Sequence, residues 1–126
     1  MRRLLLDTHA LLWVLEDDGA LIEPARSAIV DPRNDVFVSA ISMWEISIKR
    51  SLGKLRAPED LLSTVEASGF RELPVTFVHA DHAGSLPPHH RDPFDRMLVA
   101  QAQVEGLTIV THDSVIAKYG VRTLAT

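Results

Sequence analysis

The sequence predicts an α/β domain built on a mainly parallel sheet that helices cover on both faces. Short, continuous apolar runs at residues 4–6, 36–38 and 107–110 alternate along the chain with segments of helical periodicity. Strands that are buried on both faces read as continuous apolar runs, because neither face meets water. The length of 126 residues fits a single domain that spans residues 1–126.

The first half of the chain supplies two strands and three helices. We expect a strand over residues 3–6, helices over 8–15 and 23–30, and a short strand over 36–38. A helix over 41–52 follows and ends at Gly53, because glycine readily takes the left-handed conformation that closes a helix.

The second half continues the alternation. Pro58 is expected to open a helix that runs to Ala67, since proline suits the first helical position. Asp92 and Pro93 mark the start of a long helix, as N-cap and first helical residue, and Gly106 closes it. The expected elements are a strand over 72–75, a helix over 77–84, a loop over 86–91, a helix over 93–105, a strand over 107–110, a helix over 114–119 and an edge strand over 121–124.

Composition excludes several classes of protein. The net charge of −4 argues against plain coating of nucleic acid, which usually needs a basic surface. The chain has no cysteine, so disulfides and thiolate metal sites are excluded and a cytoplasmic setting is expected. Asp7 and His9 interrupt the apolar N-terminal stretch, which we therefore interpret as a strand entering a helix and not as a signal peptide.

Carboxylates follow two of the predicted strands. Asp7 comes directly after residues 4–6, and Asp113 follows residues 107–110 at a distance of three positions. Ligands of parallel sheets bind just outside the carboxyl ends of the strands, so both positions are candidates for chemistry. The alternative is helix capping, since an aspartate between a strand and a helix is a good N-cap worth about 1 kcal/mol.

A third candidate acid, Asp95, lies in the first turn of the helix over 93–105. It heads a core-facing stripe at spacings of three, four and seven residues, formed by Leu98, Val99 and Ala102. An acid in that place points toward a cleft, although it also suits a capping box. We favour Asp95 over Asp92 as the functional acid and keep Asp92 as the second choice.

Glu45 lies in the middle of a predicted helix, where no capping role exists. Its neighbours at helical spacing are apolar, namely Ile41, Ile48 and Leu52. A buried carboxylate normally needs a partner or a cation. The alternatives are a buried pair with an arginine, or an edge position from which the side chain reaches water.

Together the acids indicate a divalent-cation site. Carboxylates that meet in one pocket raise each other's pKa unless a cation is present. Oxygen ligands without sulfur favour Mg²⁺ or Mn²⁺. Such an ion neutralises charge on a phosphodiester and lowers the pKa of a water, so an acidic protein can still act on an anionic substrate.

Four stretches of the chain form a characteristic set, namely Leu6-Asp7-Thr8-His9, Val38-Ser39 with Trp44-Glu45-Ile46, the run Asp92-Pro93-Phe94-Asp95-Arg96 that opens residues 92–102, and Val110-Thr111-His112-Asp113. With the Ser-Leu-Gly-Lys-Leu run at 51–55, they resemble the PIN-domain family, and within it the VapC-type toxin branch. The resemblance covers essentially the whole chain.

This resemblance implies a three-layer α/β/α sandwich with a central parallel sheet. It implies an endoribonuclease that cuts structured RNA, such as transfer RNA, through a water activated by Mg²⁺ or Mn²⁺. The catalytic and metal-binding acids would be Asp7, Glu45, Asp95 and Asp113.

The resemblance also implies supporting groups and partners. Thr8, Ser39 and Thr111 match polar positions beside the acids. Proteins of this branch generally form homodimers and are neutralised by a cognate VapB-type antitoxin. His112 departs from the family pattern, because many relatives have a small polar or acidic residue there.

Basic side chains are candidates for substrate binding, namely Lys49, Arg50, Lys54 and Arg96. The first three lie near a helix C-terminus, where positive charge is favourable in any protein; the alternative is a rim that binds phosphate. Arg96 either pairs with an acid or touches substrate.

Histidines and tryptophans carry weaker signals. His79 with His82, and His89 with His90, suggest zinc, but no cysteine or HExxH pattern supports such a site. We expect His89, His90 and Arg91 to line the RNA groove or to face solvent. Trp13 and Trp44 are expected in the core or in a dimer interface.

Two other functions fit parts of the pattern. A phospho-receiver signalling domain has a similar size and a doubly wound sheet, but Asp7 has no adjacent acidic partner and no lysine follows the last strands where it is needed. In a non-catalytic binding module, the acids would serve only as caps and ion pairs.

Overall fold

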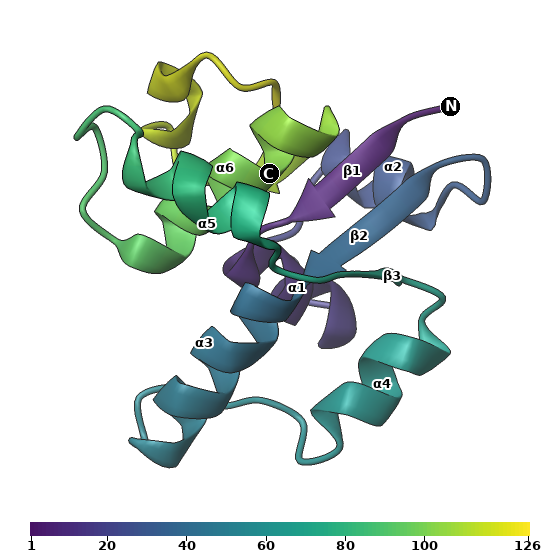
Figure 1. The fold of residues 1–126 in the computed structure, drawn as a ribbon. Coiled ribbons are helices and arrows are strands. Elements are labelled where there is room, and N and C mark those ends of the chain that lie inside the picture. Colours follow the sequence, from purple (N-terminus) through teal and green to yellow (C-terminus); the bar gives the residue numbers. More distant parts are fainter.

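A five-stranded parallel sheet forms the middle of the molecule (Figure 1) in the computed structural model, which describes all 126 residues. Its strands are β1 (Arg3–Leu6), β2 (Asp35–Ser39), β3 (Arg71–Leu73), β4 (Thr108–Thr111) and β5 (Thr123–Ala125). Their order across the sheet is β3-β2-β1-β4-β5, and every neighbouring pair is parallel. The predicted α/β class with a parallel sheet is confirmed.

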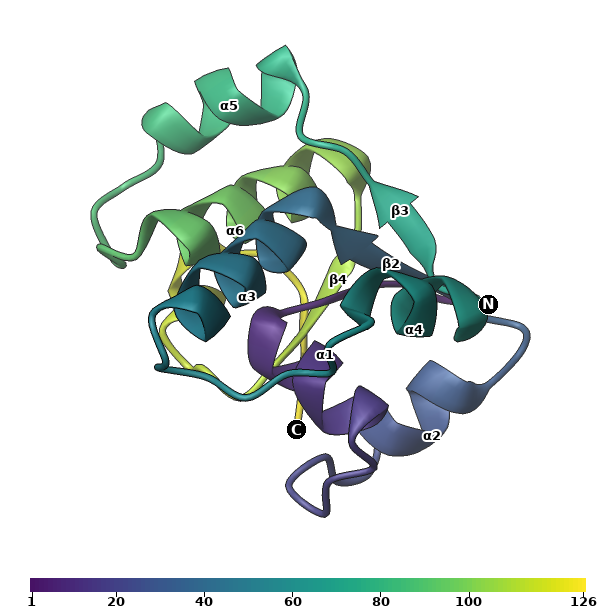
Figure 2. The same ribbon diagram turned by 90° about the horizontal axis from the view of Figure 1, so that it is seen from below.

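Helices cover both faces of the sheet, which gives the three layers seen in Figure 2. They are α1 (Thr8–Leu15), α2 (Ala25–Val30), α3 (Ala40–Ser51), α4 (Leu61–Ala67), α5 (Phe77–Gly84) and α6 (Pro93–Glu105), with a 3₁₀ turn, η1, over Ile116–Tyr119. Helices α1, α2 and α4 pack on one face, and α5 and α6 pack on the other.

The alternation of side chains along β1 connects the two halves of the core. Leu4 and Leu6 belong to the cluster that packs against α1, α2 and α4, whereas Leu5 belongs to the cluster that packs against α6. All three leucines are fully buried, as expected for a central strand with both faces covered. Successive side chains of a strand point to opposite faces, so this one strand anchors both helical layers.

Most predicted elements agree with the structure to within two residues at each end. The main exception is α4, which begins at Leu61 and not at Pro58. Pro58 lies in the preceding loop, where its carbonyl accepts a hydrogen bond from the Arg50 guanidinium at 2.7 Å. The last predicted helix is shorter than expected, a single 3₁₀ turn that ends at Gly120 with φ of +76°.

The strand order places a crevice at one end of β1. From β1 the chain builds outward through β2 and β3 on one side, and through β4 and β5 on the other. Connections therefore leave the carboxyl ends of β1 and β4 in opposite directions, which is where open α/β sheets bind ligands. No helix has the length and apolar character needed to cross a membrane.

Candidate active site

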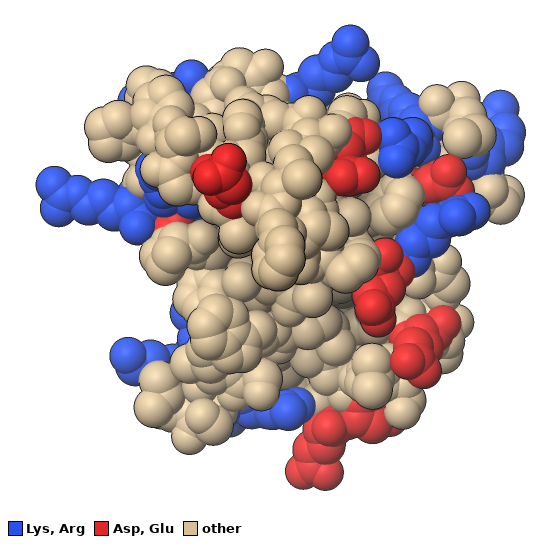
Figure 3. Space-filling model, viewed as in Figure 1, with Lys and Arg blue, Asp and Glu red and all other residues tan.

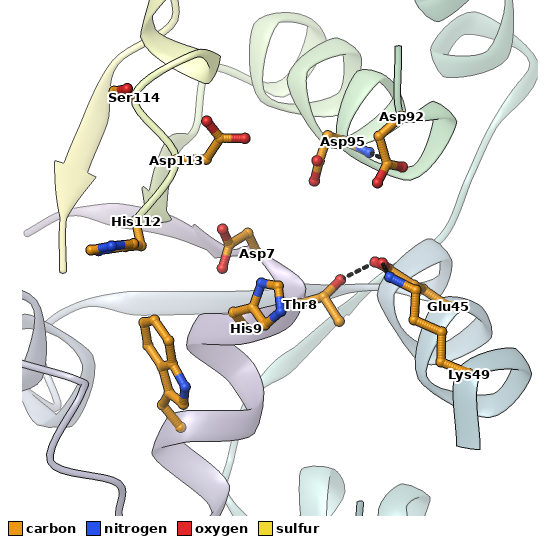
Figure 4. Close-up of a pocket in the computed structure, with 11 residues that line it drawn as sticks. Asp7, Thr8, His9, Glu45, Lys49, Asp92, Asp95, His112, Asp113 and Ser114 are labelled. Carbon is orange, nitrogen blue, oxygen red and sulfur yellow. Dashed lines mark hydrogen bonds and ion pairs between the residues drawn. The ribbon is translucent and has the colours of Figure 1, made fainter. Parts of the chain in front are cut away.

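A polar cleft of about 490 Å³ lies at the carboxyl ends of β1 and β4 (Figure 4). The acids predicted from the sequence all line it, namely Asp7, Glu45, Asp95 and Asp113. They come from four different parts of the chain, at the end of β1, the middle of α3, the first turn of α6 and the segment after β4. Trp13 is the one apolar residue in the lining.

Asp7 is held at the end of β1 by the backbone. Its N–H donates to the carbonyl of Val110 at 3.1 Å, which continues the ladder between β1 and β4. One carboxylate oxygen, Oδ1, accepts from the Ala10 amide at 2.8 Å and caps α1. Burial raises the pKa of Asp7 above its ordinary value of 3.8, and this outweighs the hydrogen bonds from Thr111 and the Ala10 amide that lower it.

Glu45 is buried, as predicted, but with polar partners. The hydroxyl of Thr8 donates to Oε1 at 2.5 Å, and the ammonium group of Lys49 pairs with Oε2 at 2.5 Å. The expected apolar stripe along α3 is wrong at its far end, since Leu52 is 61% exposed. The buried face of this helix carries Ser42 and Ile46 beside Glu45, because it faces α1 and the cleft and not the sheet core alone.

Asp92 and Asp95 lie together at the start of α6, and both line the cleft. Asp92 caps the helix, since its Oδ1 accepts from the amides of Phe94 at 2.8 Å and Asp95 at 3.4 Å. Asp95 points into the cleft (Figure 4). Burial, followed by the nearby charge of Asp92, raises the pKa of Asp95 to about 7.

Asp113 faces Asp95 across a histidine. Its Oδ1 accepts from the Val115 amide at 2.9 Å, and its Oδ2 lies 2.8 Å from Nε2 of His90. The same Nε2 lies 3.1 Å from Oδ2 of Asp95. Burial pushes the pKa of Asp113 up, but the Val115 amide and His90 together outweigh burial and leave it lowered.

Several predicted residues point elsewhere. The hydroxyl of Ser39 donates to Oε1 of Gln101 at 2.6 Å, so it supports the junction of α3 and α6 and not an acid. The guanidinium of Arg96 neither pairs with an acid nor lines the cleft; it donates to the carbonyls of Ala83, Leu86, Pro87 and His90. Arg96 therefore holds the loop before α6 against the helix.

Of the other predicted polar and basic residues, some lie beside the acids and some lie outside the cleft. Thr111 accepts from the Asp113 amide at 3.0 Å, and Thr8 contacts Glu45, so both lie beside the acids. Lys49 lines the cleft. Lys54 is exposed, and Arg50 donates a hydrogen bond to the Pro58 carbonyl in the loop after α3. Neither residue lines the cleft.

The sequence reasoning missed two contacts. Glu45 and Lys49 are four residues apart, the spacing at which side chains on a helix meet, so this pair could have been predicted from the sequence. His90 lies two positions before the N-cap of α6, which was a weaker hint that it lies close to Asp95. His112 turns away from the acids, since its Nδ1 lies 2.7 Å from the Thr126 carbonyl.

Neither tryptophan is fully buried, although Trp13 packs against one of the two core clusters. Trp44 is 58% exposed and packs edge-on against Phe94 at 5.6 Å. Trp13 is half-buried and forms a wall of the cleft with His9 and His112, at 6.0 Å from each ring.

The donor set of the cleft suits a hard divalent cation. Asp7, Asp95 and Asp113 have no lysine or arginine partner, and burial, with smaller contributions from neighbouring carboxylates, raises the pKa values of Asp7 and Asp95. Capping does not exclude coordination, because the caps of Asp7 and Asp113 each use Oδ1. Carboxylate oxygens without sulfur are the ligands that Mg²⁺ and Mn²⁺ prefer.

Known proteins resemble this chain in sequence and in fold. The family model described as "PIN domain" matches residues 4–121. Ribonuclease VapC16 of Mycobacterium tuberculosis (strain ATCC 25618 / H37Rv) is 37% identical over 65 residues, which span 48% of this chain and 46% of that protein. The aligned part is thus about half the length of that relative.

Solved structures share the fold over nearly the full chain. DNA-bound VapBC from Salmonella typhimurium has a TM-score of 0.72 at 22% identity and covers 99% of this chain and 98% of its own. VapBC-5 from Mycobacterium tuberculosis has a TM-score of 0.62 at 17% identity, with 99% and 98% covered. FitAcB from Neisseria gonorrhoeae has a TM-score of 0.65 at 18% identity, with 96% of each chain covered.

Proposed function

This chain belongs to the PIN-domain family, and we propose that it is a divalent-cation-dependent endoribonuclease, the toxin of a toxin–antitoxin pair. The observation that carries the proposal is the meeting of Asp7, Glu45, Asp95 and Asp113 in one cleft at the switch point of the sheet. The similarity to a protein named as a ribonuclease supports RNA as the substrate class. We propose structured RNA, such as transfer RNA, within that class.

The proposed cation is Mg²⁺ or Mn²⁺, held by Asp7, Asp95 and Asp113 with Glu45 beside them. When bound, such an ion lowers the pKa of a water and neutralises charge that develops on the phosphodiester. Burial and mutual repulsion make these carboxylates costly without a counter-charge, so cation binding relieves an unfavourable arrangement.

The side chains around the acids hold them in place. Thr8 fixes one oxygen of Glu45, and Lys49 balances its charge inside the cleft wall. Thr111 accepts from the Asp113 amide and so fixes the segment that carries this acid. On the face shown in Figure 3, lysines and arginines lie mainly at the periphery, and acidic side chains lie among uncharged ones nearer the middle. Because the net charge of the chain is −4, we infer that the cation, more than a broad basic surface, holds the phosphate.

Partners follow from the solved neighbours. Structures with this fold are described as VapBC complexes, two of them bound to DNA. We propose a VapB-type antitoxin for this chain, and a homodimer as its own assembly. Apolar side chains that face solvent, such as Phe77 at 96% and Val78 at 61% exposed, support the presence of a protein interface.

The nuclease proposal is tested by cleavage of structured RNA with purified protein, in Mg²⁺ or Mn²⁺ and in chelator. We expect cutting only with cation, and its loss in an Asp7→Asn/Asp95→Asn double variant. Asp81→Asn, at an exposed position outside the cleft, is the matched control and should cut like the wild type. Equal cutting by the double variant would assign the activity to a contaminating nuclease and overturn the proposal.

The partner proposal has a separate test. Expression of the chain alone should arrest growth, and co-expression with the product of the neighbouring reading frame should restore it. Harmless overexpression of the chain with its acids intact would contradict a toxin role.

A further inference from the structure

We propose that the His90 side chain and a divalent cation compete for the same two carboxylates, so that His90 weakens cation binding in the cleft. The inference rests on the proposed function, because Asp95 and Asp113 are among the acids assigned to the cation there. It concerns a residue for which the sequence suggested only a place in the groove or in solvent.

His90 reaches both acids with one atom. Its Nε2 lies 2.8 Å from Oδ2 of Asp113 and 3.1 Å from Oδ2 of Asp95. The three ligand-type atoms lie within 4.8 Å of one another, so Nε2 forms one cluster with two acids that line the cleft. Two readings fit these distances. Nε2 is either a ligand that joins the two carboxylates on a cation, or an N–H donor that takes the place of one.

The other ring nitrogen decides between these readings. The backbone N–H of Asp92 points at Nδ1 of His90, at 3.2 Å. A neutral imidazole whose Nδ1 accepts a hydrogen bond carries its proton on Nε2. A histidine that binds a metal through Nε2 instead keeps its proton on Nδ1 and donates it to an acceptor. Because Nδ1 faces a donor, Nε2 approaches the carboxylates as an N–H group and not as a ligand.

The backbone of His90 is fixed on both sides. Its N–H donates to the hydroxyl oxygen of Tyr119 at 2.7 Å, and its carbonyl accepts from Arg96 at 3.4 Å. The side chain is 19% exposed. The His90 side chain can therefore move away from the carboxylates while its backbone stays in place. A movement of the backbone would break the hydrogen bonds that hold this loop to α6.

The competition follows because the Nε2–H group and a cation are both positive and would occupy the same position. The positive end of the Nε2–H bond and a cation are both attracted by the Oδ2 atoms of Asp95 and Asp113. They repel each other at this range, so one excludes the other. Removing the imidazole should therefore tighten cation binding, whereas removing a ligand would weaken it.

The test is a calorimetric titration of the full chain with Mn²⁺. We expect His90→Ala to bind Mn²⁺ about tenfold more tightly than the wild type, the equivalent of one hydrogen bond to a charged group. His90→Gln, which keeps an N–H donor on a side chain of similar reach, should return the affinity toward the wild-type value. His82→Ala is the matched control, because His82 lies on α5, where its Nε2 is 2.6 Å from Oε1 of Gln103, and contacts neither acid; its affinity should not change.

Weaker Mn²⁺ binding by His90→Ala would make His90 a ligand and overturn the inference, with the nuclease proposal left standing. If neither the wild type nor His90→Ala binds Mn²⁺, the cation site itself is overturned, and that result is distinct from failure of the inference. Nitrogen-15 NMR of the imidazole gives a readout that needs no cation. A proton on Nε2 supports the inference, and a proton on Nδ1 overturns it even if His90→Ala folds poorly.

Discussion

Replacing Asp95 by asparagine should stabilise the cation-free protein at alkaline pH. Burial and the neighbouring charge of Asp92 raise the pKa of Asp95 to about 7 from its ordinary value of 3.8. The folded protein therefore holds this proton more tightly than the unfolded chain does. The contribution of Asp95 to stability is complete below pH 3.8 and is lost as the pH rises through 7. Asparagine has nearly the same shape and no charge to lose.

The size of the effect follows from the same pKa. A shift from 3.8 to about 7 corresponds to at most about 4 kcal/mol of folding free energy above pH 7. The hydrogen bond from His90 and relaxation of the side chain reduce this, so we expect about 1 to 3 kcal/mol. For a chain of 126 residues this raises the melting temperature by roughly 3 to 15 °C.

The assay is thermal unfolding in chelator at pH 4 and pH 8, followed by circular dichroism. Asp95→Asn and the wild type should melt alike at pH 4, and the variant should melt higher at pH 8. Saturating Mn²⁺ should reverse the order at pH 8, because only the wild type gains stability from the bound ion, about 4.1 kcal/mol at a thousandfold excess over Kd. A variant that is less stable than the wild type at pH 8 in chelator would refute the account of Asp95 as a buried, repelled carboxylate.

Three further substitutions test the interactions that hold α6 and the loop before it in place. Arg96→Met should destabilise the protein by about 1 to 3 kcal/mol, measured by urea unfolding, because the Ala83 carbonyl of α5 and three carbonyls of the loop before α6 lose their donor; unchanged stability would mean that this loop holds without Arg96. Asp92→Ala should cost about 1 kcal/mol and Asp92→Asn much less, since asparagine also caps a helix, and an equal loss in both would contradict the capping role. Leu98→Ala should cost about 2 to 5 kcal/mol in the same assay, since the side chain is fully buried under α6, and a loss below about 1 kcal/mol would show that the core collapses into the space.

The local elements could be predicted because their signals lie within a few residues. The apolar run at residues 4–6 marks a central strand, and the Asp92-Pro93 pair marks the start of α6. Both depend on backbone preferences and on periodicity, which act between near neighbours. Pro58 shows the limit of such local signals. Proline suits the first turn of a helix, but here Pro58 lies in a loop, where Arg50 donates a hydrogen bond to its carbonyl.

The positions of the acids could also be predicted, since parallel strands bring their carboxyl ends to one edge. Asp7 and Asp113 follow neighbouring strands, and the ladder continues from Val110 to Asp7. The partners of the polar side chains in and near the cleft could not be predicted. The partner of Ser39 is Gln101, 62 positions away, and His90 bridges acids 5 and 23 positions along the chain.

By itself, then, the amino-acid order determined the sequence of strands and helices, the parallel sheet, and which carboxylates lie at its edge. Tertiary packing alone decided that Ser39 binds Gln101, that Arg96 secures a loop, and that His90 stands between Asp95 and Asp113. The reason is physical. Secondary structure depends on interactions between residues close in the chain, whereas the partner of a polar side chain depends on which surfaces meet when the layers pack, and a shift of a few ångströms changes that partner.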